Sequence, residues 1–231
     1  MNLERQFSLN NKASNHLEKG INPITVCIGD NSNHDIDYLF TKFKENKKTQ
    51  NIKYAASSDY YKKENIIIDL SGYAISEGNE KNKYSEEYYN CIGMAIIGID
   101  KKTNKNISIL THKFPAVFLQ SDSLEKNFIT QLKDLVSRCK LGTLDAVIFG
   151  GDKSDGNSLK EYLEAINTIN KISKPILGFE PTISAAPKYD GETSVYLDTE
   201  NRRLYVNIPF HKDSKIYDDS KPSEIEKELD K

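Results

Sequence analysis

The distribution of apolar and polar positions along the chain predicts short strands with a few amphipathic helices between them. In the first part, β-branched residues in NPITVCIGD (22–30) predict a strand that ends in a Gly-Asp turn. Apolar residues recur at helical spacing over 35–48, which predicts an amphipathic helix. The Lys-rich stretch 44–64 carries interleaved tyrosines and indicates a solvated linker, with a grip on a nucleic acid strand as the alternative.

A longer series of elements begins at residue 66. The pattern predicts strands at 66–75, 143–151 and 174–181, helices at 123–140 and 158–172, and hairpins at 90–115 and 194–209. A polar loop over 76–90 separates the first strand from the first hairpin. Strands paired in hairpins, with two main helices between them, favour an α+β layered sandwich of mixed and antiparallel strands over a doubly wound parallel sheet.

These elements divide the chain into three parts. Residues 1–65 are expected to form an N-terminal extension with a loose tail, a short strand and helix, and the Lys-rich linker. Residues 66–210 form the main domain, and residues 211–231 form a charged C-terminal tail. A length of 231 residues fits one large domain with an appendage of this kind.

Composition and charge exclude several classes of protein. Hydrophobic residues make up 37% of the chain and charged residues 29%, so a sizeable core is expected. A net charge of -2 supplies no basic field for nucleic acid. The apolar run of the first hairpin is too short to span a bilayer, and the N-terminus has no apolar signal core. We therefore expect a cytoplasmic protein without membrane insertion, with a secreted effector that lacks a cleavable signal as the alternative.

The cysteines and histidines do not follow a metal or disulfide pattern. Cys27, Cys91 and Cys139 include no Cys-x-x-Cys pair, which indicates a reducing compartment rather than a zinc site or a disulfide framework. Cys139 completes the apolar stripe of the predicted helix at 123–140, so we expect it in the core. The glycines of IFGGDKSDGN lack the Gly-Lys-Ser/Thr of a phosphate-binding loop and indicate a structural turn. We expect neither a metal nor a cofactor.

One cysteine and one histidine stand at the two ends of the hairpin NCIGMAIIGIDKKTNKNISILTHKFP (90–115). A two-residue turn and a four-residue loop both place Gly93 opposite His112. Side chains alternate along a strand, so Cys91 and His112 then point to the same face as diagonal neighbours. A three-residue loop would place them on opposite faces. Gly93 is expected to leave room for a substrate group beside the imidazole.

A thiol beside an imidazole can perform nucleophilic catalysis. The thiolate is the nucleophile, and a neighbouring imidazolium lowers the thiol pKa. The pair can attack an amide carbonyl, after which the histidine protonates the leaving amine. The alternative is that Cys91 is an inert buried thiol and His112 a satisfied surface histidine.

Five features of residues 66–209 follow one another along the chain: SGYAI (71–75), Cys91, His112-Lys-Phe-Pro, IFGG (148–151) and the hairpin SVYLDTENRRLYV. This series resembles the chemotaxis receptor glutamine deamidases, the CheD family. SGYAI is similar to the family's early Gly-Glu-Tyr-Ala-Val strand, and Cys91 follows at a similar distance. His112-Lys-Phe-Pro resembles the family's His-x-x-Leu-Pro, and IFGG (148–151) resembles its strand that ends in Gly-Gly. The next helix and the hairpin SVYLDTENRRLYV follow in the family's order.

The resemblance implies an α/β sandwich related to toxin deamidases of the cytotoxic necrotizing factor type, and a protein-glutamine deamidase activity. It implies Cys91 as nucleophile, His112 as general base and acid, and Ser85 at the place of the family's threonine. Glu86 and Glu87 are alternatives to Ser85.

The expected partners are a protein with an exposed glutamine and a regulatory protein. The family's Gly-Ser before the cysteine is replaced here by Tyr89-Asn90. This change suggests a host protein as the target as readily as a chemoreceptor. Transglutamination and a catalytically silent binding module are the open alternatives.

Overall fold

The structure is a computed structural model that describes residues 8–10, 23–30, 34–54, 66–69, 73–86, 88, 91–113, 121–150, 156–184 and 194–208. The described helices are α1 (His34–Glu45), α3 (Asp122–Arg138) and α4 (Gly156–Leu177). The described strands form two sheets. The seven-stranded sheet has the order β1 (Ser8–Asn10), β2 (Thr25–Asp30), β12 (Arg203–Ile208), β11 (Ser194–Asp198), β6 (Asn82–Ser85), β3 (Thr49–Tyr54), β4 (Ile66–Asp69). The five-stranded sheet has the order β10 (Thr182–Ile183), β9 (Asp145–Gly150), β7 (Ile92–Ile99), β8 (Asn106–Lys113), β5 (Tyr73–Ile75).

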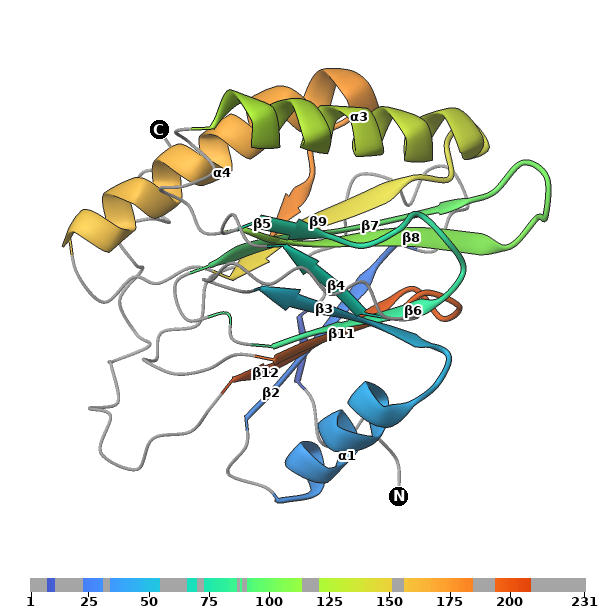
Figure 1. Cartoon of the computed structure of the whole chain (residues 1–231), viewed down its shortest axis with the longest axis vertical. Helices are drawn as coiled ribbons and strands as arrows, with labels where there is room; N and C mark the ends of the chain where they lie inside the picture. Colours follow the sequence, from blue (N-terminus) through green and yellow to red (C-terminus); the bar gives the residue numbers. More distant parts are fainter. Residues whose placement is uncertain are drawn as a thin grey trace.

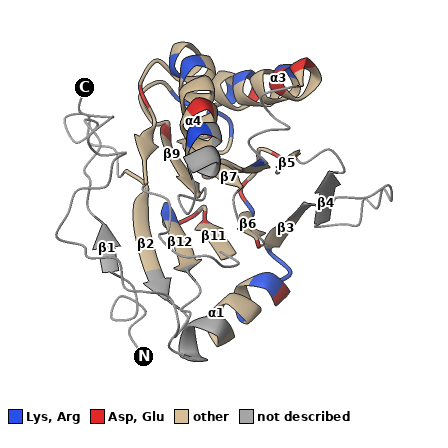
Figure 2. Cartoon of the chain, turned by 90° about the vertical axis from the view of Figure 1, so that its left-hand side faces the viewer, with Lys and Arg blue, Asp and Glu red and all other residues tan. Residues whose placement is uncertain are grey.

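The elements are stacked in layers (Figure 1). Helices α3 and α4 cover one face of the five-stranded sheet, and the other face of that sheet packs against the seven-stranded sheet. Helix α1 lies on the outer face of the seven-stranded sheet, on the opposite side of the molecule from α3 and α4 (Figure 2). Both sheets contain parallel and antiparallel pairs. The predicted α+β layered sandwich with two main helices is confirmed.

Apolar side chains fill each interface between layers. The layer under the helices contains Phe128, Leu132, Ile166 and Ile169 against Met94, Ile96 and Ile148. The layer between the sheets contains Val195, Leu197, Leu204 and Val206 against Ala95, Leu110, Val147 and Phe149. Alternate residues of β7 therefore face different layers, which is why this strand reads as an unbroken apolar run.

The N-terminal segment is part of the main sheet rather than an extension. Strand β2 pairs in parallel with β12, and β3 lies between β6 and β4. Helix α1 packs on the same sheet, where the Phe43 ring stacks on Tyr196 at 3.8 Å. The boundary at residue 65 therefore does not separate two packing units. The prediction of a linker at 44–64 is wrong where the chain forms β3. The remainder of that stretch from residue 55, and the tails 1–7 and 209–231, lie outside the described residues.

Two further predictions need correction. The single strand expected at 66–75 is divided between β4 and β5, which belong to different sheets. The strand expected at 174–181 is wrong, because α4 continues through Pro175 to Leu177. Apolar residues of this last turn still pack in the apolar layer between the helices and the five-stranded sheet, which we call the helix layer. Gly178, at a φ of 80°, follows the helix in the left-handed conformation that suits glycine.

Candidate active site

The β7–β8 hairpin has the register that its sequence predicts. The backbone N–H of Asp100 donates to the carbonyl of Lys105 at 2.8 Å, which closes a four-residue loop. Gly93 consequently lies opposite His112. Cys91 is two residues before Gly93 and belongs to the core between the sheets, and His112 bonds to a residue of the other sheet. Both side chains therefore occupy the same face of the hairpin, as predicted.

Small residues flank His112 on both sides within the sheet. Ala74 of β5 is its partner on one side and Gly93 of β7 on the other, and Phe149 of β9 pairs with Gly93. A Cβ atom on Gly93 would overlap the Phe149 ring. The expectation that Gly93 leaves room for a substrate is thus wrong, because the Phe149 ring fills this space.

Ser85 is the hydrogen-bond partner of the imidazole. Its Oγ lies 3.1 Å from Nδ1 of His112 and donates to the carbonyl of Ile52 at 3.1 Å. A hydroxyl has one proton, so with that proton on Ile52 the Ser85 oxygen accepts the Nδ1–H of His112. This arrangement leaves the lone pair of the imidazole on Nε2. Ser85 is on strand β6 and fully buried, although 76–90 was expected to be a polar loop.

The alternatives to Ser85 are not supported by the described residues. The carboxylate of Glu86 pairs with Lys44 at 2.7 Å and accepts a hydrogen bond from Tyr84 at 3.0 Å. These two contacts hold the Glu86 carboxylate on the α1 side of the seven-stranded sheet. Glu87, Tyr89 and Asn90 lie outside the described residues.

A tyrosine that sequence reasoning missed completes the surroundings of the imidazole. The Tyr88 ring stacks on the His112 ring with centroids 3.9 Å apart and an angle of 11° between the planes. Its hydroxyl donates to the carbonyl of Thr111 at 2.8 Å. Tyr88 stands between β6 and β7, where no strand or helix period marks it as buried.

Burial decides the protonation states of the pair. It raises the pKa of the Cys91 thiol to about 12 and lowers the pKa of the His112 imidazole to about 3. At neutral pH the site therefore contains a thiol and a neutral imidazole. The expectation that an imidazolium lowers the thiol pKa does not describe this resting state.

Exposure does not distinguish the three cysteines. Cys27, Cys91 and Cys139 are 4%, 3% and 3% exposed, so the expected burial of Cys139 is confirmed. Cys139 follows the last residue of α3, and its sulfur packs against Gly98 of β7. What sets Cys91 apart is its place on the same face as His112.

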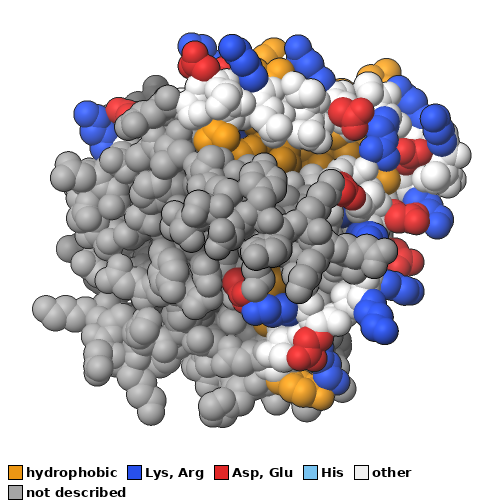
Figure 3. All heavy atoms as spheres, in the orientation of Figure 1, with side chains coloured by type: hydrophobic (Ala, Val, Ile, Leu, Met, Phe, Trp, Pro, Cys, Tyr) orange, Lys and Arg blue, Asp and Glu red, His pale blue; other side chains and the backbone are white. Residues whose placement is uncertain are grey.

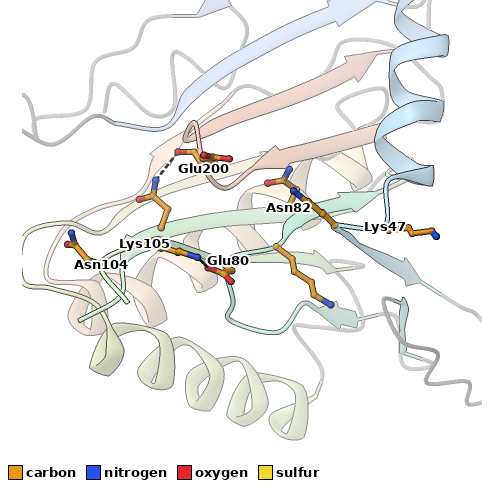
Figure 4. A pocket seen from close by; sticks show the side chains of 9 residues that line it. Lys47, Glu80, Asn82, Asn104, Lys105 and Glu200 are labelled. Atoms are coloured by element: carbon orange, nitrogen blue, oxygen red, sulfur yellow. Dashed lines mark hydrogen bonds and ion pairs between the residues drawn. The ribbon is translucent and has the colours of Figure 1, made fainter. Parts of the chain in front are cut away.

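A second candidate site is a polar hollow of about 660 Å³ at the turn end of the β7–β8 hairpin. Figure 4 shows side chains from the α1–β3 connection, the start of β6, the hairpin turn and the β11–β12 turn around it. Lys105 and Glu80 form an ion pair across part of it at 3.0 Å. The nine residues that line it are Lys, Glu and Asn only, so this hollow offers polar contacts but no thiol, hydroxyl or imidazole.

The described residues add three further observations. They contain no group of three or more His, Cys, Asp or Glu side chains that could hold a metal ion. None of their helices is long and apolar enough to cross a membrane. Acidic and basic side chains are interspersed on the described part of the face in Figure 3. Among the described residues, we therefore take Ser85, His112 and Cys91, which supply a hydroxyl, an imidazole and a thiol, as the candidate active site.

Comparisons with known proteins give no match. No protein family model matches the chain, and no curated protein matches it.

Proposed function

We propose that this protein is a cysteine-dependent protein-glutamine deamidase, with Cys91 as nucleophile, His112 as general base and acid, and Ser85 as the residue that orients the imidazole. The observation that carries the proposal is the 3.1 Å contact between Ser85 Oγ and His112 Nδ1, on the face of β8 that Cys91 shares. In sites of this kind a third residue orients the imidazole and sets its tautomer, which is the role that Ser85 can fill. The resemblance to the CheD family points to the same three residues.

The first half-reaction forms a thioester. As the Cys91 sulfur bonds to the carbon of the glutamine side-chain amide, its proton passes to His112 Nε2 and the carbonyl oxygen takes the electron pair. The C–N bond then breaks, the C=O bond reforms, and the proton on Nε2 goes to the departing nitrogen, which leaves as ammonia. Because thiol and imidazole both start neutral, the proton transfer accompanies the attack.

Water completes the cycle. A water molecule gives a proton to Nε2 of His112 as its oxygen bonds to the thioester carbon. The C–S bond breaks, the sulfur of Cys91 recovers the proton, and the product is a glutamate side chain. If an amine replaces water in this step, the product is a transglutaminated protein.

The expected substrate is a folded protein, a chemoreceptor or a host protein, that presents a glutamine side chain. The charges on the described surface are mixed in sign, which favours recognition by shape and local contacts over long-range steering by charge.

A catalytically silent binding module is the second candidate. It is favoured by the burial of the site, since Cys91 is 3% exposed and His112 0%. A silent module would bind its partner protein without altering it. A deamidase needs the site to open when substrate docks.

Intact-protein mass spectrometry distinguishes the two candidates. Purified protein is incubated with chemoreceptor cytoplasmic domains and with candidate host proteins, and both the mass gain of an amide-to-acid conversion and the released ammonia are measured. The deamidase predicts both signals with the wild type and the Cys139→Ala control, and neither with Cys91→Ala. Stable binding without a mass gain would support the silent module, and a mass gain that persists in Cys91→Ala would refute Cys91 as nucleophile.

A further inference from the structure

Tyr88 is at the point where the chain crosses from one sheet to the other. Strand β6 ends at Ser85 in the seven-stranded sheet, and β7 begins just after Cys91 in the five-stranded sheet. Tyr88 is midway between these two residues in sequence and is fully buried.

We propose that Tyr88 is the positioning residue of this site: its ring fixes the plane of the His112 imidazole, and its hydroxyl ties Tyr88 itself to β8. The ring is nearly parallel to the imidazole, at 3.9 Å and 11°, and its other neighbour is Phe149, at 5.4 Å and 56°. The Tyr88 ring thus covers one face of the imidazole, while Ser85 holds its Nδ1 edge.

The tie to β8 acts on the residue next to His112. The Tyr88 hydroxyl donates to the backbone carbonyl of Thr111 at 2.8 Å, a buried hydrogen bond. The side chain is thus held at both its ring and its tip. A buried hydrogen bond of this kind is costly to leave unmade, so it favours this one position of the Tyr88 side chain.

The stack also favours the charged form that the reaction creates. His112 becomes an imidazolium only when it takes the thiol proton, and a cation over an aromatic face is stabilised by the ring quadrupole. An interaction that strengthens in the transition state raises kcat without changing KM. Burial keeps the Tyr88 hydroxyl neutral at physiological pH, so the ring that stacks on His112 carries no charge of its own.

Three variants separate positioning from simple core packing. Tyr88→Met fills much of the volume but has no ring, and Tyr88→Phe keeps the ring but lacks the hydroxyl. Tyr162→Leu is the control, because Tyr162 is equally buried but lies in the helix layer. The tautomer of His112 is read from the ¹⁵N chemical shifts of its ring nitrogens, which are assigned with a His112→Gln variant because the chain has four histidines. Stability is followed by thermal unfolding, and kcat and KM by ammonia release from the chemoreceptor cytoplasmic domain or host protein that gains mass in the experiment above.

We expect one dominant tautomer, with the proton on Nδ1, in the wild type, Tyr88→Phe and Tyr162→Leu. Tyr88→Met should show a mixture of tautomers and a kcat about tenfold lower at an unchanged KM. Tyr88→Met with the wild-type tautomer would overturn the role of the ring. Tyr88→Phe with the thermal stability of the wild type would overturn the role of the hydroxyl, and with it the proposal. The second result decides even if Tyr88→Met fails to fold.

The measurement of kcat and KM rests on the proposed function, whereas the ¹⁵N measurement of the His112 tautomer does not. If the wild type releases no ammonia from any of the candidate substrates above, the deamidase reaction fails. The ¹⁵N shifts still decide the role of Tyr88 in that case.

Discussion

Ser85 Oγ lies 3.1 Å from Nδ1 of His112, although the two residues belong to different sheets. The contact spans the apolar layer between the sheets at one end of the sandwich. It joins a strand of the seven-stranded sheet to the hairpin that carries Cys91. If the two sheets moved apart here, Ser85 would no longer accept the Nδ1–H of His112, and the tautomer of the imidazole would not be fixed.

Ser85→Ala should lower turnover by about tenfold to a thousandfold, because the imidazole loses the acceptor that holds the proton on Nδ1. Ser85→Thr should retain most of the activity, and Cys91→Ala should have none. The matched control is Ser108→Ala, which removes another fully buried hydroxyl of the same layer, bonded to Thr199 at 2.6 Å. Ammonia release by the four variants checks the prediction, and equal activity of Ser85→Ala and Ser108→Ala would remove Ser85 from the site.

Acid should destabilise the protein partly through His112. Burial lowers the pKa of this imidazole from 6.5 to about 3, so between these values only the unfolded chain takes up the proton. The free energy of unfolding therefore falls as the pH drops below 6.5. His112→Gln should flatten this dependence. Urea unfolding of both proteins at several pH values measures the two slopes, and parallel curves would contradict a buried neutral imidazole.

Gly93→Ala should destabilise the fold by about 1–3 kcal/mol or more, because the added methyl overlaps the Phe149 ring. Gly78→Ala is the control, since its new methyl would meet its nearest neighbour at 3.3 Å. Gly93→Ala combined with Phe149→Leu should recover part of the loss. Denaturant unfolding of the three proteins tests this, and a neutral Gly93→Ala would argue against the packing of Phe149.

Cys139→Ala should leave turnover within about twofold of the wild type and lower stability by on the order of 1 kcal/mol, because a small cavity opens against Gly98. Thermal unfolding and ammonia release are measured on the same sample. A large loss of turnover at unchanged stability would give Cys139 a chemical role that its position in the helix layer does not suggest.

A chain that begins at residue 66 should fail to fold, since it lacks β2 and β3, which have partners on both sides in the sheet. In the full chain, Ile52→Ala should cost about 2–5 kcal/mol, because Ile52 is only 1% exposed. Tyr38→Ala is the control from the same N-terminal segment, because Tyr38 is 60% exposed. Circular dichroism and thermal unfolding provide the readouts, and a cooperative, folded chain from residue 66 would restore the boundary expected from the sequence.

Local periodicity determined much of this protein. The even-length loop of the hairpin sets the register of β7 and β8, and the two-residue period of a strand then puts Cys91 and His112 on one face. The same local rules predicted α1, α3, β9 and the β11–β12 hairpin. These features depend on residues that are close in sequence, so one chain is enough to infer them.

The tertiary structure alone decided the contacts between segments that are far apart in sequence. The parallel pairing of β3 with β6 brings the carbonyl of Ile52 to Ser85, and no local pattern marks either strand. The Phe149 ring fills the space over Gly93, and the Tyr88 ring covers His112, because the two sheets close on each other there. That closure also excludes water from the thiol and the imidazole, and so it sets their protonation states, which depend on burial rather than on sequence spacing.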